Sequence, residues 1–271
     1  MPVIFIDAPD DPRLADFSAV PDPMLLRERN QFVAEGRFAI ETLLRARRFS
    51  IRALLLTEST HRALAGELAA TRSADIAVYV ASAAHFKIGG YDFHRGYLAL
   101  AERPDAIALS ALIAEAAPGR PLLALERIGN PDNIGGIFRN AAAFGAAGIL
   151  LSPGCGDPFY RKAVRTSIGA TLRVPFATAA EWPGDLRRLR AGGYTVVAFT
   201  PGRKATELSA FMAEGRRSPP VALLLGAEGD GLSAEAEAEA EVRVRIAIDP
   251  SVDSLNVATA SGIALHHLAS V

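Results

Sequence analysis

The C-terminal part of the chain alternates short apolar runs with segments of helical periodicity. The apolar residues follow one another without the every-other-residue polarity of a half-exposed strand. Strands of this kind are buried on both faces, which predicts a parallel sheet with helices on each side. The expected strands are PLLALE (121–126), GILL (148–151), TVVAFT (195–200), VALLLG (221–226) and VRVRIAI (242–248). The expected helices lie near residues 133–145, 159–168, 183–191, 233–240 and 254–269.

The N-terminal part predicts a smaller α/β domain over residues 25–102, ahead of a larger domain over 121–271. Its expected elements are a helix within 32–48, a strand at 52–58, a helix at 59–70 capped by Ser59 or Thr60, a strand at 75–82, a short helix at 84–90 and a strand at 96–102. Residues 1–24 are expected to form an irregular arm with a strand at Val3–Ile6. Residues 103–120 are expected to form a linker that contains a helix.

Residue counts exclude several classes of protein. The single cysteine, Cys155, allows no intrachain disulfide and no cysteine-rich zinc site, and we interpret it as structural. The five histidines show no metal-binding spacing, so we expect no metal site; His266 and His267 suit a helix C-terminus. No apolar stretch approaches the roughly 18 residues of a membrane span, and the N-terminus lacks signal-peptide features. We therefore expect a soluble, cytoplasmic protein.

Ligands of parallel sheets bind beyond the carboxyl ends of the strands, so the loops after the expected strands form the candidate site. The first loop, residues 126–146, opens a helix near Asn133 with Gly135 and Gly136 in its first turn. Glycines there cost helix propensity but let another group approach the backbone. Arg139 follows about two turns into the helix. A helix with a surface arginine and close glycine packing shows the same pattern, so both readings stay open for this loop alone.

The second loop, LLLGAEGDGLS at residues 223–233, places glycines between a strand and the expected helix cap Ser233. Its spacing is neither G-x-G-x-x-G nor G-x-x-x-x-G-K-[ST]. That absence argues against a nicotinamide-dependent Rossmann enzyme, which is one alternative for a parallel sheet. Glu228 is placed to bind a cation or a guanidinium, although an exposed acid in a plain loop has the same appearance.

The third loop, within residues 246–268, runs through a proline turn to Ser254, Leu255 and Asn256, which open a helix. Ser254 is a candidate N-cap of that helix. The helix carries small residues that permit tight packing against another helix or a subunit, namely Ala258, Ala260, Ser261, Gly262 and Ala264.

Taken together, the three loops resemble the three motifs of the SpoU-type RNA ribose 2′-O-methyltransferases of the SPOUT superfamily. The matching stretches are PDNIGGIFRNAAAFGA, LLLGAEGDGLS and IAIDPSVDSLNVATASG. The stretch DPFYRKAVRTSIGATLRVPF, with Ser167 and Gly169, resembles the family's segment between its first two motifs. The resemblance is strong over about residues 120–271. Residues 25–102 resemble, more weakly, the family's ribosomal-protein-like RNA-binding domain, chiefly through FVAEGRFAIETLL.

The resemblance implies an α/β fold with a C-terminal parallel-sheet SPOUT domain threaded as a trefoil knot, plus a smaller N-terminal α/β RNA-binding domain. It implies S-adenosylmethionine as cofactor, a homodimer with composite sites, and an RNA substrate rather than DNA, with rRNA favoured over tRNA. The implied catalytic residues are Arg139, Asn133, Glu228, Ser254 and Asn256. The implied cofactor-binding residues are Thr200, Gly226, Ile246, Leu255 and Asn256.

Within these implied roles, we interpret Arg139 as a clamp on the developing alkoxide or on a phosphate, because a guanidinium is effectively never deprotonated in proteins. Glu228 is interpreted as orienting Arg139 or a neighbouring guanidinium through a charge-assisted pair. The third motif departs from the family, which usually has Ile-Pro-Met before its turn. Ala247 and Ile248 replace its Pro-Met, and Pro250 falls where a glycine is common. An RNA-binding protein of the same fold with lost or weak catalysis is therefore the alternative.

Taken as an average, the net charge of −1, from 29 basic and 30 acidic residues, disfavours RNA binding. The charges are segregated, however: residues 27–52 hold seven arginines and three glutamates, and residues 161–173 hold four basic residues and no acid. Only the basic segments need to face phosphate. The predicted RNA-contacting residues are Arg29, Arg37, Arg45, Arg47, Arg48, Arg161, Lys162 and Arg165.

Overall fold

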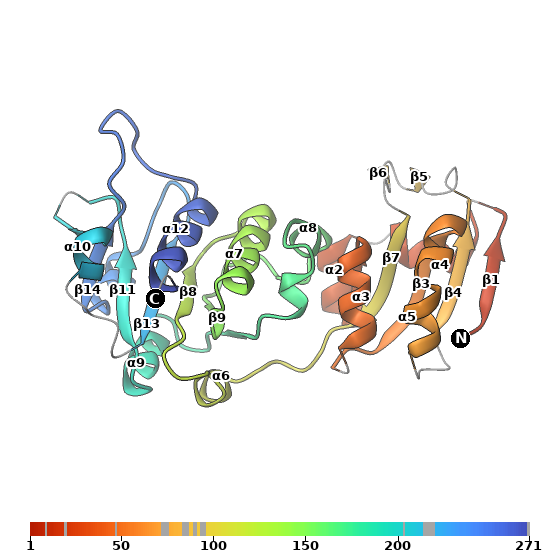
Figure 1. The fold of residues 1–271 in the computed structure, drawn as a ribbon, viewed down its shortest axis with the longest axis horizontal. Coiled ribbons are helices and arrows are strands. Elements are labelled where there is room, and N and C mark those ends of the chain that lie inside the picture. Colours follow the sequence, from red (N-terminus) through yellow and green to blue (C-terminus); the bar gives the residue numbers. More distant parts are fainter. Residues whose placement is uncertain are drawn as a thin grey trace. The chain divides into compact units, whose positions relative to one another are not determined.

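The computed structural model describes residues 1–8, 10–18, 21–46, 48–71, 76–82, 87–88, 91–92, 96–202, 204–213 and 220–269. These residues divide into two compact units (Figure 1). We call Met1–Asp105 with Pro158–Leu172 the N-terminal unit, and Ala106–Asp157 with Arg173–Val271 the C-terminal unit. Each unit contains its own large β-sheet.

The C-terminal unit is built on a seven-stranded sheet of order β10-β9-β8-β13-β11-β14-β12 (Figure 1). Its strands are β8 (Leu122–Glu126), β9 (Gly148–Leu151), β10 (Phe176–Thr178), β11 (Thr195–Phe199), β12 (Thr206–Glu207), β13 (Val221–Gly226) and β14 (Val242–Arg245). Neighbouring strands are parallel throughout, so the predicted parallel sheet is confirmed. The sequence pattern missed β10 and β12, which have three and two residues and are too short to show periodicity.

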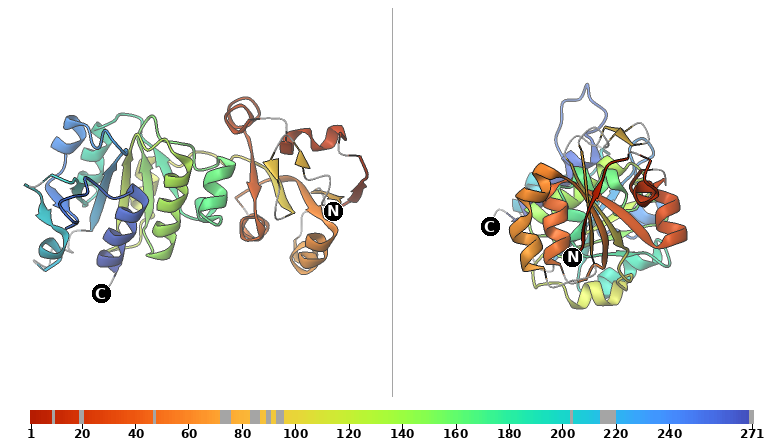
Figure 2. Two further views of the ribbon diagram at one scale, coloured as in Figure 1. Left: turned by 90° about the horizontal axis from the view of Figure 1, so that it is seen from above. Right: turned by 90° about the vertical axis from the view of Figure 1, so that its right-hand side faces the viewer.

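Helices cover both faces of this sheet, as its continuous apolar strands require (Figure 2). They are α6 (Leu109–Ala114), α7 (Pro131–Ala143), α9 (Gly184–Ala191), α10 (Leu208–Ala213), α11 (Ala234–Ala238) and α12 (Val257–Ala269). Alternate strand residues such as Leu122 and Leu224 form a core with Leu112 of α6 and Leu189 of α9. The trefoil knot that the resemblance implies stays a prediction.

The last connection of the C-terminal unit is longer than the sequence pattern indicated. β14 ends at Arg245 rather than at residue 248, and α12 begins at Val257 rather than at 254. Asp249 accepts a hydrogen bond from Ser251 N at 2.9 Å, which forms a turn around Pro250. β14 ends earlier than expected because its strand pairing ends there, with Phe199 of β11 opposite Val244 and Glu207 of β12 opposite Arg245.

The cap of α12 is Asn256, so Ser254, which was a candidate for that position, does not have this role. Asn256 Oδ1 accepts hydrogen bonds from Ala258 N at 3.0 Å and from Thr259 N at 3.2 Å. These are two of the backbone N–H groups that the first turn of a helix leaves without an internal partner. By contrast, Ser233 caps α11 as predicted, since its Oγ accepts from Ala236 N.

The N-terminal unit contains a mixed five-stranded sheet of order β1-β4-β3-β7-β2. Its strands are β1 (Val3–Ile6), β2 (Gln31–Glu35), β3 (Ile51–Thr57), β4 (Ala77–Ala81) and β7 (Tyr97–Glu102), and β7 runs antiparallel to both β2 and β3. Its helices are α1 (Ala15–Ser18), α2 (Asp22–Arg29), α3 (Arg37–Arg45), α4 (Glu58–Ala63), α5 (Ala65–Ala70) and α8 (Arg161–Thr166).

The expectation of an irregular arm over residues 1–24 is wrong apart from its strand. Pro12–Leu14 forms a 3-10 helix, and α1 and the start of α2 follow it. Leu14 and Phe17 are 1% exposed and belong to the core of this unit. The prolines and aspartates of the segment start helices, because Asp11 accepts from Arg13 N and Pro12 occupies the first helical position.

Three further local predictions need correction. The expected helix within 32–48 is β2 followed by α3, and Gly36 turns the chain between them with φ of 105°. The expected helix at 59–70 is α4 and α5, capped by Thr57 in a capping box rather than by Ser59 or Thr60. Of the expected short helix at 84–90, the structure describes only Lys87–Ile88, which pairs as a strand with Tyr91–Asp92.

The segment 158–172 folds with the N-terminal unit although it follows β9 in the chain. Phe159 stacks on Phe32 with ring centroids 4.7 Å apart. Arg161 N donates to Asp22 Oδ2 at 2.7 Å, and Arg48 Nη2 donates to Leu172 O at 2.6 Å. These contacts join this segment to the first 105 residues.

Candidate active site

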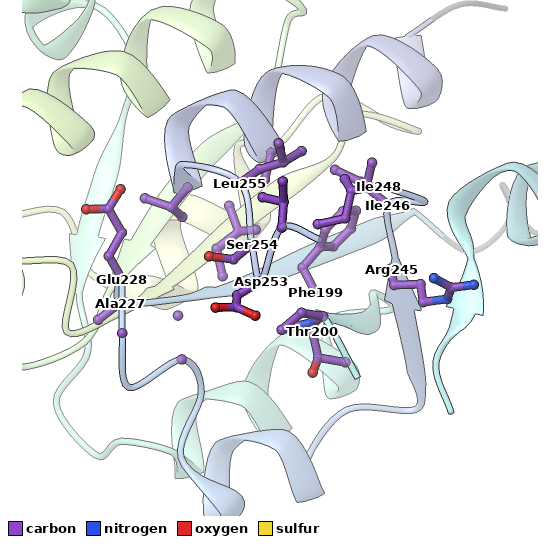
Figure 3. A pocket seen from close by; sticks show the side chains of 18 of the residues that line it. Phe199, Thr200, Ala227, Glu228, Arg245, Ile246, Ile248, Asp253, Ser254 and Leu255 are labelled. Carbon is purple, nitrogen blue, oxygen red and sulfur yellow. The ribbon is translucent and has the colours of Figure 1, made fainter. Parts of the chain in front are cut away.

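A cavity of about 640 Å³ opens beyond the carboxyl ends of β11, β13 and β14 in the C-terminal unit (Figure 3). Its lining comes from residues 199–201, from the glycine-rich loop after β13 and from the irregular connection after β14. The volume lies within the usual range for pockets that hold a small molecule, and the position is the one where parallel sheets bind ligands.

The glycine-rich loop, residues 226–233, is shaped by a close approach of its own backbone. A Cβ at Gly226 would lie 2.3 Å from the carbonyl carbon of Gly231, so no side chain fits there. Gly229 and Gly231 have φ of +88° and +67°, a region that other residues rarely adopt. The loop therefore lines the cavity with the backbone of its glycines together with Ala227 and Glu228.

Polar side chains from all three predicted motifs meet beside the cavity. Asn256 Nδ2 donates to Asn133 Oδ1 at 2.9 Å and to Glu228 Oε1 at 2.6 Å. Asn133 lies in the first turn of α7 and is 6% exposed. Since the Asn256 Oδ1 also caps α12, the orientation of this amide is fixed by four hydrogen bonds. We call Asn133, Asn256 and Glu228 the amide–carboxylate cluster.

The residues predicted to bind cofactor divide into two groups. Thr200, Gly226, Ile246 and Leu255 line the cavity, as does the catalytic candidate Ser254. Figure 3 shows Ser254 and Asp253 between the Ala227–Glu228 side of the cavity and the side formed by Thr200 and Arg245. Asn256 is not part of the lining and contributes through its hydrogen bonds to the amide–carboxylate cluster.

Arg139 does not join this cluster. It lies six residues after Asn133 on α7, which is about 9 Å along the helix axis and on another side of it. Its side chain is exposed, and within the described residues its guanidinium has no hydrogen bond or ion pair. Glu228 was expected to orient Arg139 or a neighbouring guanidinium; within the described residues of one chain it does not pair with Arg139, and it accepts a hydrogen bond from Asn256.

The small residues of α12 pack against α7. A Cβ at Gly136 of α7 would lie 2.8 Å from Ala258 Cβ, and one at Gly262 would lie 3.1 Å from Asn140 Nδ2. Asn140 Nδ2 donates to Ala258 O at 2.7 Å and to Ser261 Oγ at 3.0 Å. This packing brings the first and third motifs together, so that Asn133 can reach Asn256.

The charge of the cavity lining is predominantly acidic. Glu228, Asp249 and Asp253 all line it, and hydrogen bonds from Ser251 Oγ and N hold the pKa of Asp249 below its ordinary value. The basic residue of the lining, Arg245, already pairs with Glu207 at 2.6 Å. Such a lining favours a ligand with positive charge, and its apolar side chains suit a ligand with a flat apolar part.

Sequence reasoning missed one buried group beside the cavity. Glu126, at the carboxyl end of β8, is 2% exposed and accepts hydrogen bonds from Trp182 Nε1, Ser233 N and Ser233 Oγ. The only signal in the sequence was an acid that closes the apolar run PLLALE. Buried carboxylates are rare unless a specific arrangement needs them, so that position carried information.

The predicted RNA-contacting arginines of the N-terminal unit are largely paired with acids. Arg37 and Arg45 both contact Glu41, at 2.7 and 3.8 Å, and Arg165 lies 3.7 Å from Glu35. Arg29 pairs with Asp16. Because Arg29, Arg37, Arg45 and Arg165 remain 44–70% exposed, they can still reach an external phosphate, and we call them the exposed arginine set.

Of the other residues predicted to contact RNA, two form hydrogen bonds within the N-terminal unit and two stay predictions. Arg161 is 16% exposed and bonds to Phe17 O as well as to Asp22. Arg48 bonds to Leu172 O and lies over the Phe49 ring, so both arginines hold the segment 158–172 in place. Lys162 is exposed, and Arg47 lies outside the described residues.

Two further features of the described residues bear on membrane association and metal binding. None of their helices has both the length and the apolar character needed to cross a membrane. No group of three or more histidine, cysteine, aspartate or glutamate side chains among them is arranged to hold a metal ion.

Comparisons with known proteins point in one direction. Residues 120–266 match the model of the SpoU rRNA methylase family. An uncharacterized tRNA/rRNA methyltransferase of Mycobacterium bovis is 38% identical over 263 residues, which cover 95% of this chain and 88% of that relative. The crystal structure of an AdoMet-bound rRNA methyltransferase from Sinorhizobium meliloti is 28% identical, with a TM-score of 0.81 over 98% of this chain and 97% of that one. A solved RNA 2′-O ribose methyltransferase is 26% identical, with a TM-score of 0.77 and 98% of each chain covered.

Proposed function

The chain belongs to the SpoU rRNA methylase family, and from that premise we propose that it methylates a ribose 2′-hydroxyl of RNA. The observation that carries the proposal is the amide–carboxylate cluster beside a cavity lined by the glycine-rich loop. Bound S-adenosylmethionine supplies a methyl group on a sulfonium, which an oxygen nucleophile can attack in line. The protein must therefore bind that cation, orient the ribose and stabilise negative charge on its oxygen.

The residues present fit S-adenosylmethionine. The acidic lining, with Glu228, Asp249 and Asp253, complements a positively charged molecule. Thr200, Gly226, Ile246 and Leu255 would hold the adenosine part, largely through backbone groups that the glycine-rich loop leaves exposed. The departures Ile248 and Pro250 also line the cavity, so they change the lining without removing it. This favours an active enzyme over a binding protein that has lost catalysis.

We assign Arg139 to the substrate rather than to the cofactor. A guanidinium cannot take the hydroxyl proton at neutral pH, but it can hold developing negative charge on the 2′-oxygen or on an adjacent phosphate. Ser254 and the amides of Asn133 and Asn256 would position the ribose. Glu228 acts through Asn256, whose amide it orients.

We further propose a homodimer in which each site is completed by the second copy. Arg139 is exposed and is not among the described residues that line the cavity of its own chain. A second copy's Arg139 would bring the missing positive charge to the substrate side of the cavity. The family resemblance, which implies composite sites, supports the same arrangement.

For the substrate we propose rRNA rather than tRNA. The rRNA methyltransferase of Sinorhizobium meliloti matches 98% of this chain, so the likeness includes both units and not the C-terminal unit alone. The N-terminal unit supplies the exposed arginine set, which suits the phosphates of a structured RNA.

Two measurements test the proposal. Calorimetry with S-adenosylmethionine and, separately, with NAD should give binding of the first alone. Incubation with methyl-tritiated S-adenosylmethionine and deproteinised rRNA or tRNA should label rRNA. RNA binding without cofactor binding would instead favour a catalytically inactive member of the fold, and NAD binding would contradict the proposal.

A further inference from the structure

Glu126 is a buried carboxylate whose hydrogen bonds come from neutral donors. Oε1 accepts from Ser233 Oγ at 2.7 Å and from Trp182 Nε1 at 2.8 Å, and Oε2 accepts from Ser233 N at 2.8 Å. No basic side chain of the described residues forms an ion pair with it. Removing a carboxylate from water without a cation is costly, so the three donors must offset that cost.

The position of Glu126 links it to both ends of the glycine-rich loop. In the register between β8 and β13, Glu126 lies opposite Gly226, where the loop begins. Its hydrogen bonds reach Ser233, where the loop ends and α11 begins. Within the loop, Gly231 N donates to Ala227 O at 3.0 Å and the backbone of Gly231 lies against Gly226. The Glu126 side chain is therefore hydrogen-bonded to the C-terminal end of the glycine-rich loop, while its backbone lies opposite the start of the loop.

Trp182 holds Glu126 from a different element. It precedes α9, and its ring packs partly buried against the core formed by the sheet with α6, α9 and α11. The indole N–H can donate but cannot accept, so it requires an acceptor at that place. A glutamine at position 126 would place its NH₂ group, which can only donate, against a neighbouring donor. The carboxylate of Glu126 accepts all three hydrogen bonds.

We propose that Glu126 is a positioning residue that fixes the shape of the glycine-rich loop and, through Glu228 in that loop, the orientation of the amide–carboxylate cluster. The inference rests on the proposed function, because it assigns Glu126 to the binding of S-adenosylmethionine. It predicts that the carboxylate acts on cofactor affinity and on loop order, and not on the affinity for RNA.

The test compares Glu126→Gln with Asp185→Asn. Asp185 is a second buried carboxylate of the same unit, 1% exposed, which accepts from Glu181 N at 2.9 Å and pairs with Arg188 in α9. Both substitutions are nearly isosteric, and each replaces a buried carboxylate that accepts hydrogen bonds, so both are expected to lower stability. They differ in position, because the cavity lining contains no described residue of α9. A melting temperature for each variant shows what fraction is folded before binding is measured.

Hydrogen–deuterium exchange of the cofactor-free protein is the first readout. We expect peptides over residues 226–233 to exchange faster in Glu126→Gln and unchanged in Asp185→Asn. Calorimetry is the second readout: we expect S-adenosylmethionine affinity to fall about tenfold or more in Glu126→Gln, as when a buried donor loses its partner. Glu126→Asp, which keeps the charge, should recover part of that affinity.

The outcomes separate this inference from the proposed function. If the wild type binds no S-adenosylmethionine, the proposed function fails, and loop exchange still reports whether Glu126 orders the loop. If Glu126→Gln leaves loop exchange and cofactor affinity at wild-type values, the inference is overturned. Equal loss of affinity in both variants would assign Glu126 a structural role only and would also overturn it.

Discussion

The cavity of the C-terminal unit and the exposed arginine set of the N-terminal unit are built on opposite principles. Around the cavity, neutral amides, glycines and one buried carboxylate are fixed by short hydrogen bonds from several elements. In the N-terminal unit, arginines pair with acids at the surface, where each pair is worth little and can exchange for another anion. The cavity is preorganised for one small ligand, whereas the arginines can rearrange on a large polyanion.

The difference also explains why the role of some residues can be inferred from their local sequence, whereas the role of others cannot. A glycine with no room for Cβ has its role set by local backbone geometry. An exposed arginine has its role set by whichever anion approaches it.

The largest effect is expected from Arg139→Ala, which removes the guanidinium that we assign to contact the substrate. Methyl transfer should fall about 10²–10³-fold or more, because transition-state charge loses its donor. S-adenosylmethionine affinity, measured by calorimetry, should stay at the wild-type value, since Arg139 does not line the cavity. Wild-type turnover in Arg139→Ala would exclude this role.

A mixing experiment extends that prediction to the proposed homodimer. Arg139→Ala and Gly226→Ala damage different parts of the site, so a mixed dimer with composite sites regains one intact site. At a cofactor concentration too low to saturate Gly226→Ala, subunits exchanged between the two variants should show faster methyl transfer than either parent. No gain over the parents after verified subunit exchange would indicate that each chain completes its own site.

The next largest effect is expected from Gly226→Ala. The added Cβ would meet the Gly231 backbone at 2.3 Å, so the glycine-rich loop must shift and cofactor affinity should fall about tenfold or more. Gly66→Ala in α5 of the N-terminal unit is the matched control, because a Cβ there meets nothing within 4 Å and alanine favours a helix. Calorimetry should show normal cofactor binding in Gly66→Ala. Equal affinity in both variants would contradict the preorganised cavity.

A smaller effect is expected from the double variant Arg37→Gln/Arg45→Gln. Both arginines contact Glu41, and their loss should weaken rRNA binding and lower its salt slope by about 0.9 or less per lost phosphate contact. The control is Arg187→Gln/Arg190→Gln, two arginines of α9 that likewise share Glu239. Filter binding at several salt concentrations should show no change in the control. Equal slopes for the two variants would remove these arginines from the RNA contact.

The smallest effect concerns Cys155, which follows β9 and donates to Leu125 O at 3.4 Å. Burial raises the pKa of the Cys155 thiol above its ordinary value, so at pH 8 less of it is thiolate than in a free cysteine. Alkylation by iodoacetamide, followed by mass spectrometry, should be slower in the folded protein than in denaturant. Equal rates would show that the thiol is not protected.

The sequence predicted those parts of the molecule that depend on neighbouring residues. Continuous apolar runs predicted the parallel sheet, and glycine spacing located the loop that lines the cavity. The hydrogen bonds of Glu126 to Trp182 and Ser233 span 56 and 107 residues, and no local pattern encodes such pairs. The same holds for the stacking of Phe159 on Phe32, which places the segment 158–172 in the N-terminal unit.

Counting charges along the sequence could not show which arginines are paired, for a related reason. The excess of basic residues over 27–52 and 161–173 was visible, but the acids that pair with Arg29, Arg165 and Arg161 lie at positions that only the fold brings near. Arg161, which was predicted to contact RNA, is only 16% exposed and lies 3.9 Å from Asp22. Composition gives the charge of a segment, whereas burial decides which charges remain available.

The most direct test of ribose methylation is a map of 2′-O-methyl sites in total RNA from a strain that lacks the gene. The same strain should be complemented with the wild type and with Arg139→Ala. We predict that one or more 2′-O-methyl sites in rRNA disappear with the gene, return with the wild type and stay absent with Arg139→Ala. An unchanged map, or loss of a base methylation with every ribose site retained, would contradict the assignment.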